Sequence, residues 1–264
     1  MDGNSPQSGF IDKLSDVVVT FVCWFYFIFA FLTFFSFFYV VVFCFFKNRE
    51  QAFQYLDHLF FKGFLSLLRA LAPRQKWEID QEIRNIHGSI IVCNHLSYLD
   101  PLILISLLPR QKTIVKTKFF HAPVFGWLIK NSGYLPASTE GAHAQRMIEH
   151  VETMGGFLES GGNLFVFPEG TRNSNGRLGK FYKGVFKIGR MHRCPIHVLS
   201  LCNTDKLFTP GKFFFTTRIF NTISMKKLGC IKPASTQELT TATVLEREVR
   251  QIFEKAGSCR GEAQ

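Results

Sequence analysis

The sequence contains no Gly-x-Ser-x-Gly, the strained turn that presents a serine nucleophile, and no Cys-x-x-Cys pair. It also contains no internal repeat and no long low-complexity linker. These absences exclude a serine-elbow hydrolase and a repeat protein. The seven cysteines are odd in number, and Cys23 and Cys44 lie inside a long apolar run, so the cysteine pattern indicates a reducing compartment.

Charge, proline and glycine are all absent from the 30 residues between Val17 and Phe46. As one helix this run would be about 45 Å long, against roughly 30 Å of bilayer hydrocarbon. Nothing in it marks a turn, so segment 17–46 is predicted to be one tilted transmembrane helix, with a membrane-embedded, re-entrant segment as the alternative. A cleaved signal peptide fits poorly, because the run is too long and no small-residue cleavage site follows it.

Acidic residues are outnumbered: the net charge is +11 and the isoelectric point is about 9.4, which indicates a polyanionic partner. No nucleic-acid recognition motif is present, so an anionic membrane surface explains the charge better than nucleic acid does. One basic residue, Lys13, precedes the apolar run, whereas Lys47, Arg49 and Lys62 follow it. The positive-inside rule therefore predicts that the C-terminal part faces the cytoplasm.

Four further segments are predicted around the membrane run. Residues 1–16 form a polar tail, and residues 47–75 contain an amphipathic helix with apolar side chains at helical spacing. This helix is predicted to lie at the lipid interface; packing on the domain core is the alternative. Residues 76–256 form one catalytic domain, and residues 257–264 form a second tail.

Strand and helix signals alternate within the predicted domain. Strand-like runs lie near Ile90, Ile114, Leu164 and Val198, and helix-like segments cover residues 101–108, 142–160 and 236–256. This alternation predicts an α/β fold with a mainly parallel sheet flanked by helices, preceded by the N-terminal transmembrane helix and the amphipathic helix.

A histidine and an aspartate, His95 and Asp100, lie at a turn between a strand-like run and an apolar helix. An aspartate that holds one imidazole nitrogen leaves the other nitrogen able to take a proton from a hydroxyl. Ser97 is too near His95 in sequence to face it, so we interpret it as a turn or cap residue. The structural alternative is that Asp100, followed by Pro101, is a helix N-cap.

A second polar turn, Phe167 to Arg172, follows the strand-like run Asn163–Val166. It carries a carboxylate, a hydroxyl and a guanidinium around a glycine. Two such turns, both at the ends of apolar strands, are typical of the walls of a single site.

These residues resemble the motifs of the 1-acyl-sn-glycerol-3-phosphate acyltransferases and related glycerolipid acyltransferases. Asn-His-x-Ser-x-x-Asp is matched from Asn94 to Asp100, and Phe-Pro-Glu-Gly-Thr-Arg is matched without change from Phe167 to Arg172. A second block is matched by Lys116, Pro123 and Gly126. The run Cys194–Val198 loosely resembles the fourth motif of the family, which is a proline-led apolar strand.

The resemblance implies a membrane-bound acyltransferase in which His95 takes the proton of a lysolipid hydroxyl and Asp100 orients His95. It implies further that the substrates contact Lys116, Glu169, Gly170, Thr171 and Arg172. The acyl donor would be acyl-CoA or acyl-acyl carrier protein, and the product would be phosphatidic acid for phospholipid synthesis. No cofactor and no metal are implied.

The chain departs from the family pattern in the second block. Many members continue with Gly-x-x-x-x-Asp-Arg, whose arginine is thought to meet the acceptor phosphate, but here Gly133 is followed by Ser138 and Thr139. Arg146 would have to replace that cation from elsewhere. Lys118 also stands where the family usually has an acid. Two alternatives therefore remain: an acyltransferase or transacylase for a different lysolipid, and a non-catalytic lipid-binding protein on the same fold.

Two other groups of residues have compositions found in binding sites. His87, Cys93 and His95 fit no established zinc spacing. A basic run is usually a solvated helix face, although here it can also meet lipid phosphates or an anionic acyl carrier; it consists of Lys180, Lys183, Lys187, Arg190 and Arg193.

Overall fold

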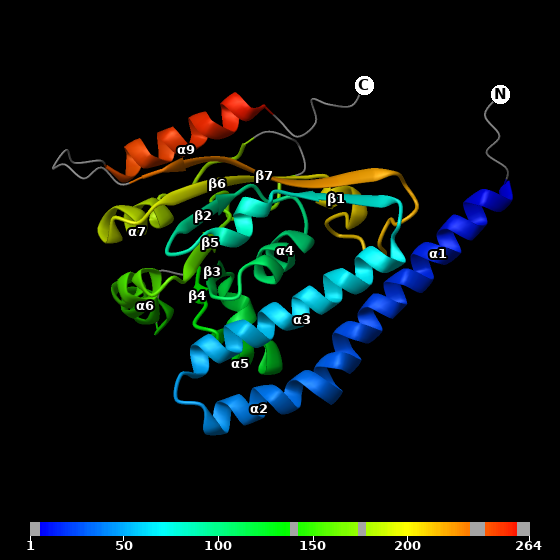
Figure 1. Ribbon diagram of the computed structural model, residues 1–264, viewed down its shortest axis with the longest axis horizontal. Helices are drawn as coiled ribbons and strands as arrows, with labels where there is room; N and C mark the ends of the chain where they lie inside the picture. The colour runs from blue at the N-terminus through cyan, green and yellow to red at the C-terminus, as the bar shows by residue number, and fades with distance from the viewer. Residues whose placement is uncertain (1–5, 138–141, 174–177, 233–240, 258–264) are drawn as a thin grey trace.

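A computed structural model of the chain describes residues 6–137, 142–173, 178–232 and 241–257. It shows a sheet with helices on both faces and a long N-terminal helix that lies beside the helix following it in the chain (Figure 1). The predicted fold class is confirmed: the sheet is mixed but mostly parallel, and the long apolar helix precedes it.

The sheet has seven strands in the order β1-β7-β6-β2-β5-β3-β4. Every neighbouring pair is parallel except β6 and β7, which are antiparallel. Four of the strands coincide with the predicted apolar runs, whereas β1, β4 and β7 were not predicted. The strands are β1 Gln75–Ile79, β2 Ile90–Cys93, β3 Gln111–Val115, β4 Leu135–Pro136, β5 Asn163–Val166, β6 Ile196–Cys202 and β7 Asn221–Ile231.

Helices cover both faces of the sheet. Alternate residues of β2 show the division, because Ile91 joins a core with α4, whereas Ile90 joins a core with α6, α7 and α9. A strand buried on both faces is apolar at every position, which explains the unbroken run Ile90–Cys93. The helices are α3 Arg49–Leu71, α4 Leu99–Leu107, α5 Pro123–Asn131, α6 Ala142–Glu159, α7 Gly184–His192, α8 Thr204–Leu207 and α9 Ala242–Ala256, with short 3₁₀ turns at Gln81–Asn85 and Thr117–His121.

The N-terminal helix is longer than the sequence predicted. It consists of α1 (Pro6–Phe25), a π-helical stretch (Tyr26–Phe35) and α2 (Ser36–Phe45), and its part Asp12–Phe45 is long and apolar enough to cross a membrane. The segment predicted as a polar tail, residues 1–16, is helical from Pro6 in its described part. Polar groups there have partners: the Asp16 carboxylate accepts hydrogen bonds from the backbone and hydroxyl of Thr217.

Helix α3 lies between the N-terminal helix and the sheet. Phe64 and Leu68 on one side pack into the core of the α/β domain, and Phe53 and Phe60 on another side pack against the N-terminal helix. Most large apolar residues of this amphipathic helix are therefore covered by protein, which corresponds to the alternative that the sequence left open, although Tyr55 and Leu59 are exposed.

The basic run beside α7 is exposed. Lys183, Lys187 and Arg190 all face solvent, whereas Val185, Phe186 and Ile188 of the same helix are buried. This is the pattern of a solvated amphipathic helix face. Any role of these cations towards an anionic partner stays a prediction.

Candidate active site

The carboxyl ends of the parallel strands bring the predicted site residues to one edge of the sheet. His95 follows β2, Glu169 follows β5 and Lys116 follows β3, and these strands are neighbours in the order β2-β5-β3. Parallel strands present their carboxyl ends at the same edge, where ligands of open α/β sheets bind. The residues predicted from three separate stretches of sequence therefore lie at one edge of the fold.

His95 and Asp100 are in direct contact. Nδ1 of His95 lies 2.8 Å from Oδ2 of Asp100, and the Asp100 side chain is fully buried. In neutral imidazole this contact assigns the proton to Nδ1, which leaves the lone pair on Nε2. The His95 side chain keeps 18% of its surface exposed, so the imidazole is accessible from outside the fold.

The carboxylate of Asp100 is held by four donors. Oδ2 also accepts hydrogen bonds from the backbone nitrogens of Leu96 (2.6 Å) and Ser97 (2.8 Å), and Oδ1 accepts one from Oγ1 of Thr204 (2.6 Å). Asp100 is not the N-cap residue of α4, a position that Tyr98 occupies, so the capping alternative is wrong. Its carboxylate instead organises the turn before the helix and orients His95.

The turn that carries His95 is fixed from both sides. The side-chain amide of Asn94 donates to and accepts from the backbone of Leu201 in β6, both at 2.7 Å. Oγ of Ser97 donates to the carbonyl of Phe208 at 2.7 Å and accepts from the backbone nitrogen of Leu99. The interpretation of Ser97 as a turn residue agrees with these contacts.

The second motif packs directly on the first. The rings of His95 and Phe167 are stacked, with centroids 4.2 Å apart and planes at 20°. The backbone nitrogen of Asn173 donates to the carbonyl of His95 at 2.8 Å. Two motifs that are distant in sequence therefore form one wall.

Glu169 and Gly170 shape this wall. Oε2 of Glu169 accepts a hydrogen bond from the backbone of Gly179 at 2.8 Å, and the residue is 8% exposed. Gly170 has a φ of 66°, and a Cβ there would lie 2.6 Å from the ring of Tyr182. Both residues were predicted to contact substrate, whereas the contacts seen here are within the loop that follows β5. Thr171, beside them, is exposed.

Arg172 lies above the ring of Tyr98, its guanidinium carbon 3.5 Å from the ring centre. Nη1 of Arg172 is buried and has no hydrogen-bond partner among the described residues. A buried, unpaired cationic donor is costly, so this nitrogen favours an anionic ligand.

The second motif block, matched by Lys116, Pro123 and Gly126, shapes the chain near the site more than it contacts the site residues. Lys116 is exposed and directly precedes the turn Thr117–His121; no hydrogen bond or ion pair between described residues joins it to His95 or Arg172. A Cβ on Gly126 would lie 2.5 Å from the carbonyl of Phe120, so only glycine lets α5 approach that turn. Ser138 and Thr139 lie outside the described residues.

Sequence reasoning missed two residues of the site. Thr204 lies 104 positions after Asp100, and no local pattern marks it as a carboxylate partner. Tyr98 occupies a variable position inside the first motif, and its contact with Arg172 depends on the fold. In the part of the chain that the structure describes, no three His, Cys, Asp or Glu residues are grouped so that they could hold a metal ion.

Residues 74–201 match the family model described as Acyltransferase. The chain is 34% identical over 146 residues to the chloroplastic 1-acyl-sn-glycerol-3-phosphate acyltransferase BAT2 of Brassica napus, which covers 54% of this chain and 42% of that protein. It is 31% identical over 163 residues to the 1-acyl-sn-glycerol-3-phosphate acyltransferase of Saccharomyces cerevisiae, covering 57% and 48%. The matches thus span less than half the length of these two relatives.

A solved structure has the same fold over almost the whole chain. The crystal structure of the 1-acyl-sn-glycerophosphate acyltransferase PlsC from Thermotoga maritima superposes with a TM-score of 0.68, covering 96% of this chain and 99% of that one at 18% identity. The matched region 74–201 contains both polar turns. Residues 74–201, just under half of the chain, match the acyltransferase family model, and this part of the chain is similar to the 1-acyl-sn-glycerol-3-phosphate acyltransferases.

Proposed function

We propose that the protein is a membrane-bound O-acyltransferase that transfers a fatty acyl group from a thioester to the free hydroxyl of 1-acyl-sn-glycerol-3-phosphate, which gives phosphatidic acid. The observation that carries this proposal is the contact between Nδ1 of His95 and the buried carboxylate of Asp100. It leaves Nε2 of His95 as a base at an accessible turn. The names of the relatives support the same reaction.

The proposed reaction is a direct transfer. Nε2 of His95 takes the proton of the lysolipid hydroxyl while the hydroxyl oxygen attacks the thioester carbonyl carbon. Asp100 stabilises the imidazolium that forms. The carbon–sulfur bond then breaks, and the proton passes from His95 to the departing thiolate. No covalent intermediate on the protein is needed, which agrees with a site built without its own nucleophile.

Arg172 is the proposed phosphate ligand of the acceptor. Its buried Nη1 lacks a partner among the described residues, and a guanidinium binds phosphate with two parallel hydrogen bonds. The donor would be acyl-CoA or acyl-acyl carrier protein; both are anionic and suit the exposed cations beside α7.

A second acceptor class is kept open by one feature of the sequence. Thr139, outside the described residues, stands where many relatives are thought to hold a phosphate-binding arginine. A different lysolipid, or transacylation between lipids, would use the same histidine. A non-catalytic lipid-binding protein is disfavoured, because such a protein has no need for a histidine and aspartate held in this geometry.

For the N-terminal helix we propose a position along one leaflet, with the α/β domain facing the cytoplasm. Asp16, near one end, bonds to Thr217 of the domain, and Phe43, near the other, packs on Trp127 of α5 with ring centroids 5.4 Å apart. Both ends of the helix thus contact the same α/β domain. If the helix crossed the bilayer, part of that domain would have to lie within the membrane to keep both contacts. The contacts therefore favour the membrane-embedded alternative over the predicted single crossing.

The test is an acyl-transfer assay with the purified protein in lipid vesicles. A panel of lysolipids that differ in headgroup is paired with acyl-CoA and with acyl-acyl carrier protein, and His95→Ala serves as the inactive control. Transfer to lysophosphatidate above all other acceptors is the expected result. Equal or better transfer to a phosphate-free acceptor would overturn the acceptor assignment, and no transfer with any pair would overturn the enzymatic one.

A further inference from the structure

The segment between α8 and β7 exposes an unusual number of large apolar side chains. We define residues 212–220 as the aromatic loop. Within it Phe213 is 50% exposed, Phe214 45%, Ile219 42% and Phe220 87%. Four such side chains lie within eight positions, and the rings of Phe213 and Phe214 are in contact, with centroids 5.2 Å apart. Clustered exposed apolar side chains mark contacts with partners or membranes.

Hydrogen bonds hold the aromatic loop in this conformation. The backbone nitrogen of Phe215 donates to Oγ1 of Thr20 at 3.0 Å, and Oγ1 of Thr217 donates to the Asp16 carboxylate at 2.6 Å. Nε2 of Gln75 donates to the carbonyl of Ile219 at 2.8 Å. The exposure of the apolar rings is therefore a fixed property of the fold.

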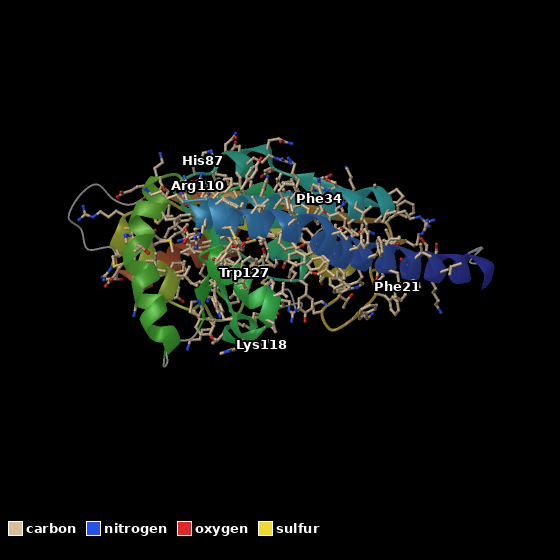
Figure 2. The ribbon with its side chains drawn as sticks, turned by 90° about the horizontal axis from the view of Figure 1, so that it is seen from below. Phe21, Phe34, His87, Arg110, Lys118 and Trp127 are labelled. Carbon is tan, nitrogen blue, oxygen red and sulfur yellow. The ribbon has the colours of Figure 1, made fainter. Side chains whose placement is uncertain are left out.

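The aromatic loop continues the apolar surface of the N-terminal helix. The rings of Phe213 and Trp24 are stacked, with centroids 5.6 Å apart and planes at 5°, and Phe21 packs edge-on against both Phe213 and Phe214. Phe21 and Phe25 are themselves 57% and 61% exposed. Figure 2 labels Phe21 and Phe34 along this helix, seen from below.

Basic groups lie at the edge of the same surface. Lys212 is exposed, and the guanidinium of Arg74 lies over the ring of Phe220, 5.4 Å from its centre. Arg74 also bonds to the carbonyl of Arg218. Aromatic rings flanked by cations suit the boundary between hydrocarbon and anionic headgroups, where rings enter the lipid and cations remain with the phosphates.

We propose that the aromatic loop is a second membrane-binding element, which inserts Phe213, Phe214 and Phe220 into an anionic bilayer beside the N-terminal helix. This proposal rests on the membrane-bound acyltransferase proposed above. The loop belongs to the cytoplasmic α/β domain, so its insertion fixes the orientation of that domain on the leaflet.

The stretch of chain just before the aromatic loop contacts the turn that carries His95. Thr204, before the loop, donates to the Asp100 carboxylate, and the carbonyl of Phe208 accepts from Ser97. The ring of Phe208 lies 5.9 Å from that of Tyr98 and 4.5 Å from that of Phe215. Insertion of the loop therefore places the turn that carries His95 beside the lipid surface, from which an amphiphilic acceptor arrives.

The first experiment compares Phe220→Trp with Met191→Trp in vesicles of phosphatidylcholine and phosphatidylglycerol. Met191 is a matched control because it is 51% exposed on α7, on the other face of the sheet. Tryptophan fluorescence is measured against the wild-type background with and without bromine-tailed lipid. Quenching of the added signal at position 220 and none at position 191 is the expected result; equal quenching, or none at 220, would overturn the proposal. This readout needs no activity.

The second experiment compares the double variant Phe214→Ser, Phe220→Ser with Met191→Ser. Activity is measured with acceptor in vesicles and with acceptor dispersed in detergent. We expect the double variant to lose at least about tenfold in rate on vesicles, since two apolar rings no longer enter the lipid, and to keep its rate in detergent. Met191→Ser should change neither rate.

The other outcomes separate the two proposals. Equal loss in vesicles and detergent would show that the aromatic rings serve the fold, and unchanged rates in both would show that they do not serve membrane binding; either overturns the loop proposal and leaves the proposed function standing. Lipid-specific quenching at position 220 in a protein without activity would overturn the proposed function instead. A change of the double variant from dimer to monomer in detergent, without lipid quenching, would assign the surface to a second copy of the chain.

Discussion

The guanidinium carbon of Arg172 lies over the ring of Tyr98, 3.5 Å from its centre, at the point where the two motifs meet. Tyr98 packs in turn on Phe208, whose carbonyl accepts the hydroxyl of Ser97. The aromatic side chain inside the first motif therefore sets the position of the cation at the end of the second. This contact was not apparent from either motif alone.

Replacing Tyr98 should test this positioning. We expect Tyr98→Leu to raise the KM for a phosphate-bearing acceptor about 3- to 30-fold, the worth of a cation–π contact of roughly 0.5–2 kcal/mol. Tyr98→Phe keeps the ring and should behave like the wild type. Steady-state kinetics with each substrate varied separately give the result. An effect on the donor KM alone would contradict the positioning role.

Arg172 itself should contribute to acceptor binding. Arg172→Ala is expected to lower kcat/KM for lysophosphatidate by about 1.5–3 kcal/mol, the value of a charge-assisted hydrogen bond, with little change in donor KM. Arg172→Lys keeps the charge but loses the paired geometry, so its kcat/KM should lie between the values of the wild type and Arg172→Ala. If Arg172→Ala weakens the thioester donor and spares the acceptor, this loop binds the donor.

The sequence was most informative where structure is local. The apolar runs near Ile90, Ile114, Leu164 and Val198 became β2, β3, β5 and β6. The reason is clearest for β2, which is buried at every position and apolar throughout. The unpredicted β7 is an inner strand that is partly exposed, with Lys226 and Lys227 in its middle. Its pairing with both β1 and β6 depends on residues far away in the chain.

The same distinction applies to the site. The spacing of His95 and Asp100 on one turn was enough to predict their contact, but not the partners of the carboxylate. Asp100 looked like a helix cap because a proline follows it, whereas its oxygens are occupied by Leu96, Ser97 and Thr204. Thr204 begins α8 just after β6, and the pairing of β6 with β2 brings it to Asp100.

The role of His95 as a base is the next prediction. His95→Ala should lower kcat at least about 10²-fold, the usual contribution of a positioned general base. The folded state should be little affected, because the imidazole is partly exposed and its partner Asp100 keeps three other donors. Single-turnover transfer and thermal unfolding in vesicles measure the two effects. Near-normal turnover would refute the mechanism.

Asp57 in α3 predicts a pH-dependent stability. Burial raises the pKa of its carboxyl from 3.8 to about 6, although hydrogen bonds from Ser132 and Tyr39 favour the charged form. The folded state thus binds a proton that the unfolded chain has lost. The contribution of this proton to the free energy of unfolding is greatest below about pH 4. It is lost as the pH rises through 6, and the total loss is roughly 3 kcal/mol.

Asp57→Asn should remove this contribution. The difference in unfolding free energy between wild type and variant is expected to change between pH 4 and 7, with the wild type losing stability relative to the variant as the pH rises. Thermal unfolding in detergent over that range measures it. Glu159→Gln, at an exposed carboxylate of α6, is the control and should show no such trend. A constant difference for Asp57→Asn would mean that the carboxyl does not titrate in this window.

The last prediction separates the two roles of Asp100. Asp100→Asn should lower kcat at least about 10²-fold and also lower the unfolding temperature, because the amides of Leu96 and Ser97 lose a charged acceptor. Thr204→Val removes only the donor to Oδ1 and leaves the contact with His95 in place. It should destabilise the fold by about 1–3 kcal/mol, the cost of leaving a buried polar group unpaired.

Thr204→Val should in addition lower kcat without changing the acceptor KM, since an unpaired carboxylate oxygen lets the carboxylate rotate away from His95. Thr204→Ser keeps the hydroxyl and should restore both stability and rate. Unfolding temperature and kcat are measured on the same preparations in vesicles. If Thr204→Val lowers the unfolding temperature while kcat stays at the wild-type value, Thr204 supports only the fold, and the orientation of His95 depends on the backbone amides of the turn alone.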